Sequence, residues 1–312
     1  MTDSRPIALP PPLHVLERGW LSANHVLGLG PEGATLVDSG YHSHAAQTLA
    51  LVHSTLNGQP LAHLINTHLH SDHCGGNAAL QARYPGLHTA IPPGQADAVR
   101  QWDEEALSYR ATGQHCPRFE VDAILQPGSQ IALGGLDWQV LAAPGHDPHA
   151  VLLFQTDEGI LISGDALWEN GFGVVFPELD GESGFEEVSD TLELIASLSP
   201  RVVIPGHGAP FGGGESVRQA IDRARSRLRQ FQDHPAQHLR YALKVLIKFR
   251  LMEWQRVPLE ELLRWGRATP YLQRLHARHG EGVILDDWLL DLIGSLVAAG
   301  AAQTSGDWVL DR

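Results

Sequence analysis

The amino-acid sequence predicts an α/β protein followed by a smaller helical region. Between residues 25 and 204, short apolar runs bounded by glycine or proline alternate with stretches of helical periodicity, which indicates strands and helices in one α/β domain. Beyond Pro235 the apolar residues recur mainly at helical spacing. We therefore expect one domain over residues 1–234 and a second over residues 235–312.

Composition and charge are those of a globular protein with two unlike parts. Of the 312 residues, 43% are hydrophobic and 19% are charged, and the chain is long enough to bury a sizeable core. The formal net charge of −14 is uneven: residues 1–210 carry 7 Lys and Arg against 24 Asp and Glu, whereas residues 211–312 carry 15 against 12. Such a balance makes the chain a weak binder of polyanions.

Features of the termini and cysteines bear on location. Residues 1–13 are polar and rich in proline, without the apolar core of a signal peptide, and no apolar run approaches the length of a membrane span. Two cysteines, Cys74 and Cys116, are too few for a disulfide framework. We expect a cytoplasmic protein with no membrane contact, in which Cys74 is a small buried residue; a nucleophile or a metal ligand is the alternative.

The first elements lead to the most informative stretch of the chain. Strands are expected over residues 25–29 and 34–37 as a hairpin, and the second of them ends at Asp38, which either reaches toward a site or serves in a turn. Residues 44–56 have helical periodicity, and the apolar run 61–66 is the next expected strand.

The stretch from Thr67 to Asn77 contains three imidazoles and one carboxylate within six positions: His68, His70, Asp72 and His73. Imidazole nitrogen and carboxylate oxygen are the usual ligands of catalytic zinc and related metals. A histidine-rich surface loop is the alternative, but a strand before the cluster and a glycine pair with a helical pattern after it would hold ligands rigidly. One cluster cannot fill two metals, so further ligands are expected downstream.

Later strands repeat one rule. They are expected over residues 123–125, 130–133, 138–143, 151–154, 160–163 and 201–204. Three of them run into a glycine beside His146, Asp165 or His207. Glycine lets the backbone turn sharply near an ion, and strand ends place ligands accurately. A shared rule in four segments favours a metal site over isolated core histidines.

These motifs together resemble those of the metallo-β-lactamase superfamily. The matching residues, in the family's order, are Asp38, the run from His68 to His73, His146, Asp165 and His207. The resemblance implies an αββα sandwich with two metal ions at the sheet edges. It assigns His68, His70 and His146 to one ion, Asp72, His73 and His207 to the other, and Asp165 to both.

The resemblance also implies a hydrolytic mechanism. Two divalent ions about 3.5 to 4 Å apart lower the pKa of the water between them, and the bridging hydroxide would be the nucleophile. Asp72 would be the catalytic carboxylate that orients this hydroxide and takes its proton, and Asp38 would fix a ligand by hydrogen bonding. Zinc is the first choice for both ions, with iron or manganese as alternatives.

Differences between this sequence and individual branches of the superfamily narrow the reactions that we expect. The oxygen-reducing di-iron branch has a glutamate where this chain has His70, so redox chemistry is disfavoured. The glyoxalase II branch usually has a histidine where this chain has Leu69, so a thioesterase of that type loses weight without being excluded. Trp168, Phe172 and Phe176 would line the mouth of a substrate pocket, or else pack in the core.

The sequence leaves the role of two polar or basic stretches undecided. Residues 94–118 would cover a substrate pocket or form a plain surface excursion. The helix expected over residues 214–233 carries five arginines, a pattern typical of a solvated face.

The C-terminal region is expected to be all-helical or of winged-helix type. Helices are expected over about residues 237–254, 258–266, 268–278 and 284–298, before a closing strand pair. A similar appendage occurs in the branch of the lactamase-like ribonucleases.

Three functions follow. The first is a hydrolase that attacks an ester, thioester or lactone carbonyl of a small molecule, as a monomer or a homodimer. The second is a phosphodiesterase that cuts single-stranded RNA, with nucleic acid as the partner. The third is a metal-binding regulator without catalysis.

Overall fold

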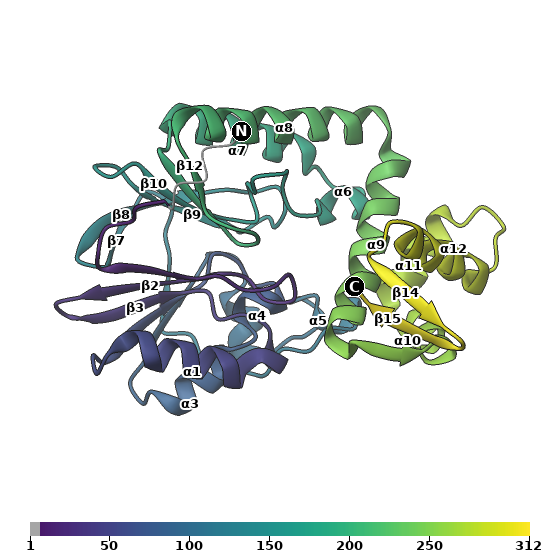
Figure 1. Ribbon diagram of the computed structural model, residues 1–312, viewed down its shortest axis with the longest axis horizontal. Helices are drawn as coiled ribbons and strands as arrows, with labels where there is room; N and C mark the ends of the chain where they lie inside the picture. Colours follow the sequence, from purple (N-terminus) through teal and green to yellow (C-terminus); the bar gives the residue numbers. More distant parts are fainter. Residues whose placement is uncertain (1–6) are drawn as a thin grey trace. The chain divides into compact units, whose positions relative to one another are not determined.

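A computed structural model describes residues 7–312 of the protein. The chain forms two compact units (Figure 1). Residues up to Trp102 and residues 116–230 make the first unit, and residues 103–115 and 231–312 make the second. The boundary predicted at residue 234 lies close to the end of the first unit.

The first unit contains two six-stranded sheets. The first sheet has the order β1 (Leu13–Leu16), β2 (His25–Gly30), β3 (Gly33–Val37), β4 (Leu61–Ile65), β5 (His88–Ile91) and β6 (Ala123–Ile124). Antiparallel pairing joins β1, β2 and β3, whereas β3 to β6 are parallel. The carboxyl ends of the parallel strands therefore meet at one edge, where Asp38 and the histidine cluster follow β3 and β4.

The second sheet has the order β12 (Phe211–Gly212), β11 (Val202–Pro205), β10 (Ile160–Gly164), β9 (Val151–Gln155), β8 (Leu136–Ala142) and β7 (Gln130–Leu133). Only β10 and β11 are parallel neighbours in this sheet. Asp165 follows β10 directly, and the turn after β11 carries His207.

Helices cover the outer faces of both sheets, so that the layers have the predicted αββα order (Figure 1). The core between the sheets includes Val37 and Ile65 of the first sheet and Trp138 and Ile162 of the second. On the outer face of the first sheet, α1 (Ala45–Leu56) and α3 (Asn77–Arg83) contribute the buried residues Val52, Leu56 and Leu80. The expected fold class is thus confirmed.

Two helices lie along the second sheet in Figure 1, α7 (Phe185–Leu198) and α8 (Gly214–Asp233). The bounds of α8 agree with those predicted, whereas α7 was not predicted. Its buried residues Val188, Leu192 and Ile195 recur at helical spacing on one face. Shorter helical segments are η1 (His42–His44), α2 (Ser71–Cys74), α4 (Ala96–Gln101) and α6 (Phe176–Asp180).

The second unit combines helices with a small sheet. Its helices are α5 (Tyr109–Thr112), α9 (Pro235–Trp254), α10 (Leu259–Ala268), α11 (Pro270–His279) and α12 (Leu285–Ala298). Three strands form a sheet in the order β13 (Arg256–Pro258), β15 (Trp308–Asp311) and β14 (Ala302–Ser305). The C-terminal region is helical as expected and has the expected closing strand pair, but β13 makes it less purely helical than predicted. The winged-helix resemblance stays a prediction.

Part of the polar stretch 94–118 belongs to this second unit. Arg250 donates a hydrogen bond to the carbonyl oxygen of Gly113. A Cβ added to Gly113, whose φ is +67°, would lie 2.9 Å from Nε1 of Trp265. Residues 103–115 therefore pack against the C-terminal helices, a role that neither expectation for this stretch included.

No helix within residues 7–312 has both the length and the apolar character needed to cross a lipid bilayer.

Candidate metal centre

The histidine cluster is held in a tight loop between β4 and α3. The Asn66 side chain donates to the carbonyl oxygen of His73 over 3.1 Å and accepts a bond from the Asn77 side chain over 2.7 Å. A Cβ on Gly76 would collide with the backbone oxygen of Ser39. The glycine is therefore required by close packing of the loop against the segment after β3.

Three imidazoles form the first group of predicted ligands. Nε2 of His68 lies 3.0 Å from Nδ1 of His70, which lies 2.8 Å from Nε2 of His146. Nδ1–H of His146 donates to the carbonyl oxygen of Val174 over 2.5 Å, which leaves the lone pair of Nε2 available. Three nitrogens that face one another at these distances fit a shared cation.

The second group consists of Asp72, His73 and His207. Nε2 of His207 lies 3.1 Å from Oδ2 of Asp72. Nε2 of His73 is buried and makes no hydrogen bond of standard geometry within residues 7–312; its contact is the ion pair of 3.4 Å with Oδ1 of Asp165. A buried nitrogen that is satisfied so weakly suits a ligand of a bound metal.

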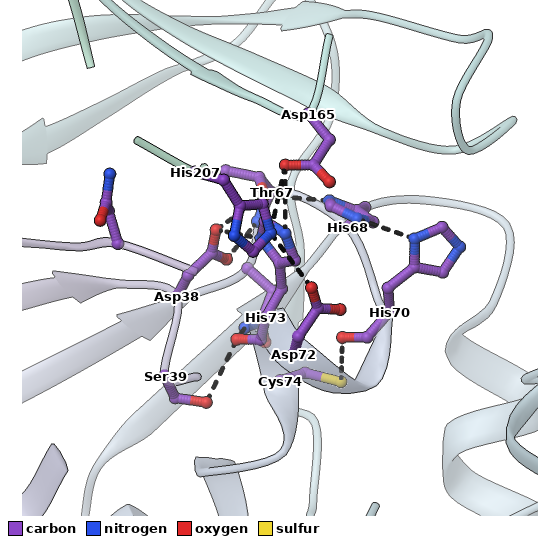
Figure 2. A network of polar contacts seen from close by, with 12 residues as sticks. Asp38, Ser39, Thr67, His68, His70, Asp72, His73, Cys74, Asp165 and His207 are labelled. Atoms are coloured by element: carbon purple, nitrogen blue, oxygen red, sulfur yellow. Dashed lines mark hydrogen bonds and ion pairs between the residues drawn. The ribbon is translucent and has the colours of Figure 1, made fainter. Parts of the chain in front are cut away.

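Asp165 lies between the two groups. Its Oδ1 is 3.4 Å from Nε2 of His73 and 3.8 Å from Nε2 of His207, and its Oδ2 is 3.5 Å from Nε2 of His146. The two oxygens of one carboxylate are therefore divided between the groups. Figure 2 shows Asp165 approaching the histidine loop from the opposite sheet. This arrangement fits the predicted bridging position.

Asp38 holds the far side of His73. Its carboxylate accepts hydrogen bonds from Nδ1 of His73 over 2.8 Å, from the Thr67 hydroxyl over 2.8 Å and from the Thr67 backbone N–H over 2.9 Å. Asp38 has a φ of +58° and is only 2% exposed. A non-glycine residue in this region is strained, and the three bonds keep it there. The result is a fixed orientation of the His73 ring.

The charges of these groups suit metal binding. Burial lowers the pKa of His68 well below its ordinary value and lowers that of His146 to about 4, so both imidazoles are neutral near pH 7. Burial alone would raise the pKa of Asp165, but His207 and His73 instead hold it well below its usual range. Neutral imidazoles and ionised carboxylates are the protonation states that bind divalent metals.

The opposite balance holds at His73. Burial alone would lower its pKa, but the carboxylates of Asp165 and Asp38 raise it well above the ordinary value. The two carboxylates therefore make the surroundings of His73 favourable for positive charge, as the binding of a cation requires.

The three predicted pocket residues have different positions. The Trp168 indole N–H donates to Oδ1 of Asp165 over 3.2 Å, and the Phe176 ring lies 5.5 Å from the His70 ring. Both are partly buried beside the candidate centre. Phe172 is only 1% exposed, which agrees with the alternative in which its ring packs in the core.

Sequence reasoning missed Trp20 and Asn24. Trp20 is 55% exposed, and its ring is stacked on that of His207 at 5.4 Å with an interplanar angle of 5°. The Asn24 side chain donates to the carbonyl oxygens of Pro205 and Gly208, which fixes the turn that bears His207. Neither residue lies in a periodic pattern or a ligand motif, so the sequence had no signal for them.

Cys74 agrees with the interpretation as a buried residue. Its Sγ lies 3.3 Å from the carbonyl oxygen of His70 and 3.8 Å from Sγ of Cys116, and neither cysteine forms a disulfide.

Comparisons with known proteins agree with this geometry. The hydroxyacylglutathione hydrolase of Synechococcus sp. (strain JA-3-3Ab) is 34% identical over 119 residues, which are 38% of this chain and 40% of that protein. The human acyl-coenzyme A thioesterase MBLAC2 is 29% identical over 178 residues, which are 50% of this chain and 59% of that protein. The chain thus spans about two fifths and three fifths of these relatives.

A solved structure supports the fold over most of the chain. The metallo-beta-lactamase family protein TTHA1429 from Thermus thermophilus superposes with a TM-score of 0.56 and 21% identity, covering 98% of this chain and 100% of that one. The sequence model of the metallo-beta-lactamase superfamily matches residues 18–207, which is more than half of the chain. With its αββα layers and its histidine and aspartate donors at the sheet edges, the chain belongs to the metallo-beta-lactamase superfamily.

Proposed function

We propose that the protein is a metal-dependent hydrolase of small carboxyl thioesters, with related esters and lactones as further substrates. The observation that carries this proposal is the division of the Asp165 carboxylate between two groups of donors. The names of the two relatives favour thioesters over the other carboxyl compounds. Leu69, which departs from the usual glyoxalase II motif, argues against a glutathione thioester as the sole substrate.

We assign the donors as the resemblance implies. His68, His70 and His146 would hold one divalent ion, Asp72, His73 and His207 the other, and Asp165 both. Zinc is the preferred metal, with iron or manganese as alternatives. When bound, the ions would polarise the substrate carbonyl and lower the pKa of an attacking water.

The chain's own residues would orient this water and move its proton. Burial alone would raise the pKa of Asp72, but the hydrogen bond from His207 and the charge of His73 lower it, so that Asp72 is ionised and can accept a proton. Asp38 keeps the His73 ring in place. In the reaction, the water oxygen bonds to the carbonyl carbon, the C–S bond breaks, and the water proton goes to the departing sulfur through Asp72 or solvent.

The ribonuclease alternative has less support from the basic helix α8. Arg225 makes an ion pair of 2.7 Å with Glu193, and Arg218 makes one of 2.8 Å with Glu215. These arginines are partly neutralised, which weakens the case for a phosphate-binding surface. A regulator without catalysis is also less favoured, because none of the seven predicted donors is missing from the centre.

A substrate panel tests the proposal. The protein reconstituted with zinc, manganese or iron is assayed on acyl-coenzyme A and glutathione thioesters, a lactone, an aryl ester, a phosphodiester and single-stranded RNA. We expect turnover of a thioester that is lost in His70→Ala and kept in His63→Ala, a matched control on the exposed part of β4. Cleavage of RNA without turnover of any carboxyl compound would overturn the proposal of a thioester hydrolase.

We further propose, from the sequence, that the protein is cytoplasmic and forms a homodimer, and that small molecules are favoured over nucleic acid as its partners. Size-exclusion chromatography with light scattering tests the homodimer directly.

A further inference from the structure

Two arginines of α8 do not follow the pattern of a solvated face. Arg223 and Arg227 are four residues apart and therefore lie on the same side of the helix. Nε–H of Arg223 donates to the carbonyl oxygen of Glu169 over 2.9 Å, and Nη1–H of Arg227 donates to that of Asn170 over 3.2 Å. Both guanidinium groups thus bind consecutive carbonyls of the loop that follows β10.

The loop has a shape that fits Arg227. The backbone N–H of Trp168 donates to the carbonyl oxygen of Gly171 over 2.7 Å and closes a small hairpin. Gly171 has a φ of +127°, and a Cβ at this position would collide with Nη1 of Arg227 and lie 3.2 Å from its Cδ. The arginine therefore lies directly against the Gly171 backbone, where a Cβ would push the guanidinium aside, and the positive φ itself favours glycine.

This hairpin carries Trp168 to the candidate centre. The indole N–H of Trp168 donates to Oδ1 of Asp165, the oxygen nearer to His73 and His207. The Trp168 ring lies edge-on to the His207 ring at 5.6 Å. A shift of the hairpin would move the indole relative to both side chains.

The helix itself is anchored. Ile221, Ala224 and Leu228 of α8 are each at most 4% exposed, so one apolar stripe fixes the helix while the arginines project from another side. Each guanidinium donates to one loop carbonyl from a rigid plane of N–H groups, a geometry that a flexible lysine ammonium does not reproduce.

We propose that Arg223 and Arg227 are positioning residues for the metal centre. By holding the carbonyls of Glu169 and Asn170, they fix the Trp168 hairpin, and with it the hydrogen bond to Asp165 and the ring beside His207. The inference rests on the proposed ligand roles of Asp165 and His207. It does not depend on which substrate the enzyme hydrolyses.

Metal binding by the full-length protein tests the inference without a substrate. The double variant Arg223→Ala/Arg227→Ala is compared with Arg229→Ala, which removes an exposed arginine from the same helix. Zinc affinity is measured by competition with a chromophoric chelator, and the ligand geometry is followed in the visible spectrum of the cobalt(II) form. At the position that binds zinc more weakly, we expect the double variant to have an affinity about 10-fold lower than the wild type. We also expect its cobalt spectrum to be altered, whereas affinity and spectrum of the control are unchanged.

A mutant cycle separates positioning from a general structural role. If the arginines act through the hairpin, their replacement in a Trp168→Phe background causes little further loss of zinc affinity. Fully additive losses, or a double variant that matches Arg229→Ala in both affinity and spectrum, would overturn the inference. The variant Arg223→Lys/Arg227→Lys should restore only part of the affinity.

Gly171→Ala disrupts the same contact by a change in the loop and substitutes neither arginine. It should reproduce the cobalt spectrum of the double variant, and it serves as the deciding variant if the double variant does not fold. A wild-type cobalt spectrum in Gly171→Ala contradicts the proposed contact. Because these measurements use metal alone, the inference can fail while thioester hydrolysis stands, and the reverse also holds.

Discussion

The two compact units bury polar side chains in different ways. Among residues 7–312, the first unit buries several titratable groups: His25, His68, His73, His146, His207, Asp38, Asp147 and Asp165. The second unit buries one histidine, His238, with Thr112 and Thr269 as its other buried polar residues within the described part of the chain. Burying charged groups costs stability unless they are paired, so their concentration in one place indicates a functional centre.

The comparison between His73 and His238 shows what surroundings do to the same side chain. Burial lowers the pKa of His238 to about 4, and its ring packs against that of Phe231 at 4.9 Å. At His73 two carboxylates overcome burial and raise the pKa. A buried histidine is thus an ordinary core residue in one unit and part of a charged cluster in the other.

The largest expected effect is the loss of the Asp165 carboxylate, which should disrupt the charged cluster that distinguishes the first unit from the second. We expect Asp165→Ala to remain folded but to fall from two bound metal ions toward one or none, with loss of hydrolysis, because both donor groups lose a ligand. Metal content by mass spectrometry after dialysis measures the effect. Asp137→Ala, at an exposed position of β8, is the control. Two ions still bound to Asp165→Ala would refute the bridging role.

Replacement of the carboxylate behind His73 should affect one group more than the other. Asp38→Asn keeps the size of the side chain but removes the charge that orients His73. We expect the affinity for the second ion to fall about 10- to 100-fold while the first ion is bound nearly as before. Calorimetric titration with zinc distinguishes the two events, and an equal weakening of both would show that Asp38 supports the whole loop instead.

The exposed ring over His207 should matter for substrate and little for stability. Trp20→Ala is expected to raise KM about fivefold, which corresponds to about 1 kcal/mol of aromatic contact, with kcat nearly unchanged. The midpoint of thermal unfolding should stay within error, because Trp20 is more than half exposed. A fall in kcat with an unaltered KM would instead place this ring in the chemical step.

The smallest effect concerns the second unit. In the unfolded chain His238 has its ordinary pKa of 6.5, whereas in the folded protein the pKa of His238 is about 4. As the pH falls, the unfolded chain therefore binds this proton first. This group therefore lowers the free energy of unfolding as the pH falls from about 6.5 to about 4, by up to about 3 kcal/mol.

His238→Leu should remove this pH dependence. Urea unfolding of both proteins between pH 4 and 7 would show the variant gaining stability relative to the wild type as the pH falls. A difference that stays constant with pH would contradict the assignment of His238 as a neutral core residue.

The predictable parts of the molecule were those that local sequence encodes. The bounds of α8 and most strands followed from periodicity, and the loop from His68 to His73 from ligand types at close spacing. Strand-end glycines beside His146, Asp165 and His207 extended this reasoning to distant segments. Their roles as ligands stay predictions, although the structure brings their donor atoms together.

The parts that were not predictable depend on contacts between distant segments. Trp20 is significant because it stacks on His207, and nothing near Trp20 in the sequence encodes that contact. Phe172 and Phe176 lie in one apolar stretch, and only the folded backbone decides which ring faces inward. Residues 103–115 are polar and irregular, so their packing against the C-terminal helices left no periodic signal.

The division of the donors between two sheets also bears on how the protein folds. Asp38 and His68 to His73 follow strands of the first sheet, whereas His146, Asp165 and His207 follow strands of the second. Long-range strand pairing is slow, so the centre is complete only after the sheets have docked. Ions bound there would stabilise the native state more than the transition state for folding. We therefore expect metal to slow unfolding strongly and to change the folding rate little, which would make the loaded protein long-lived against proteases.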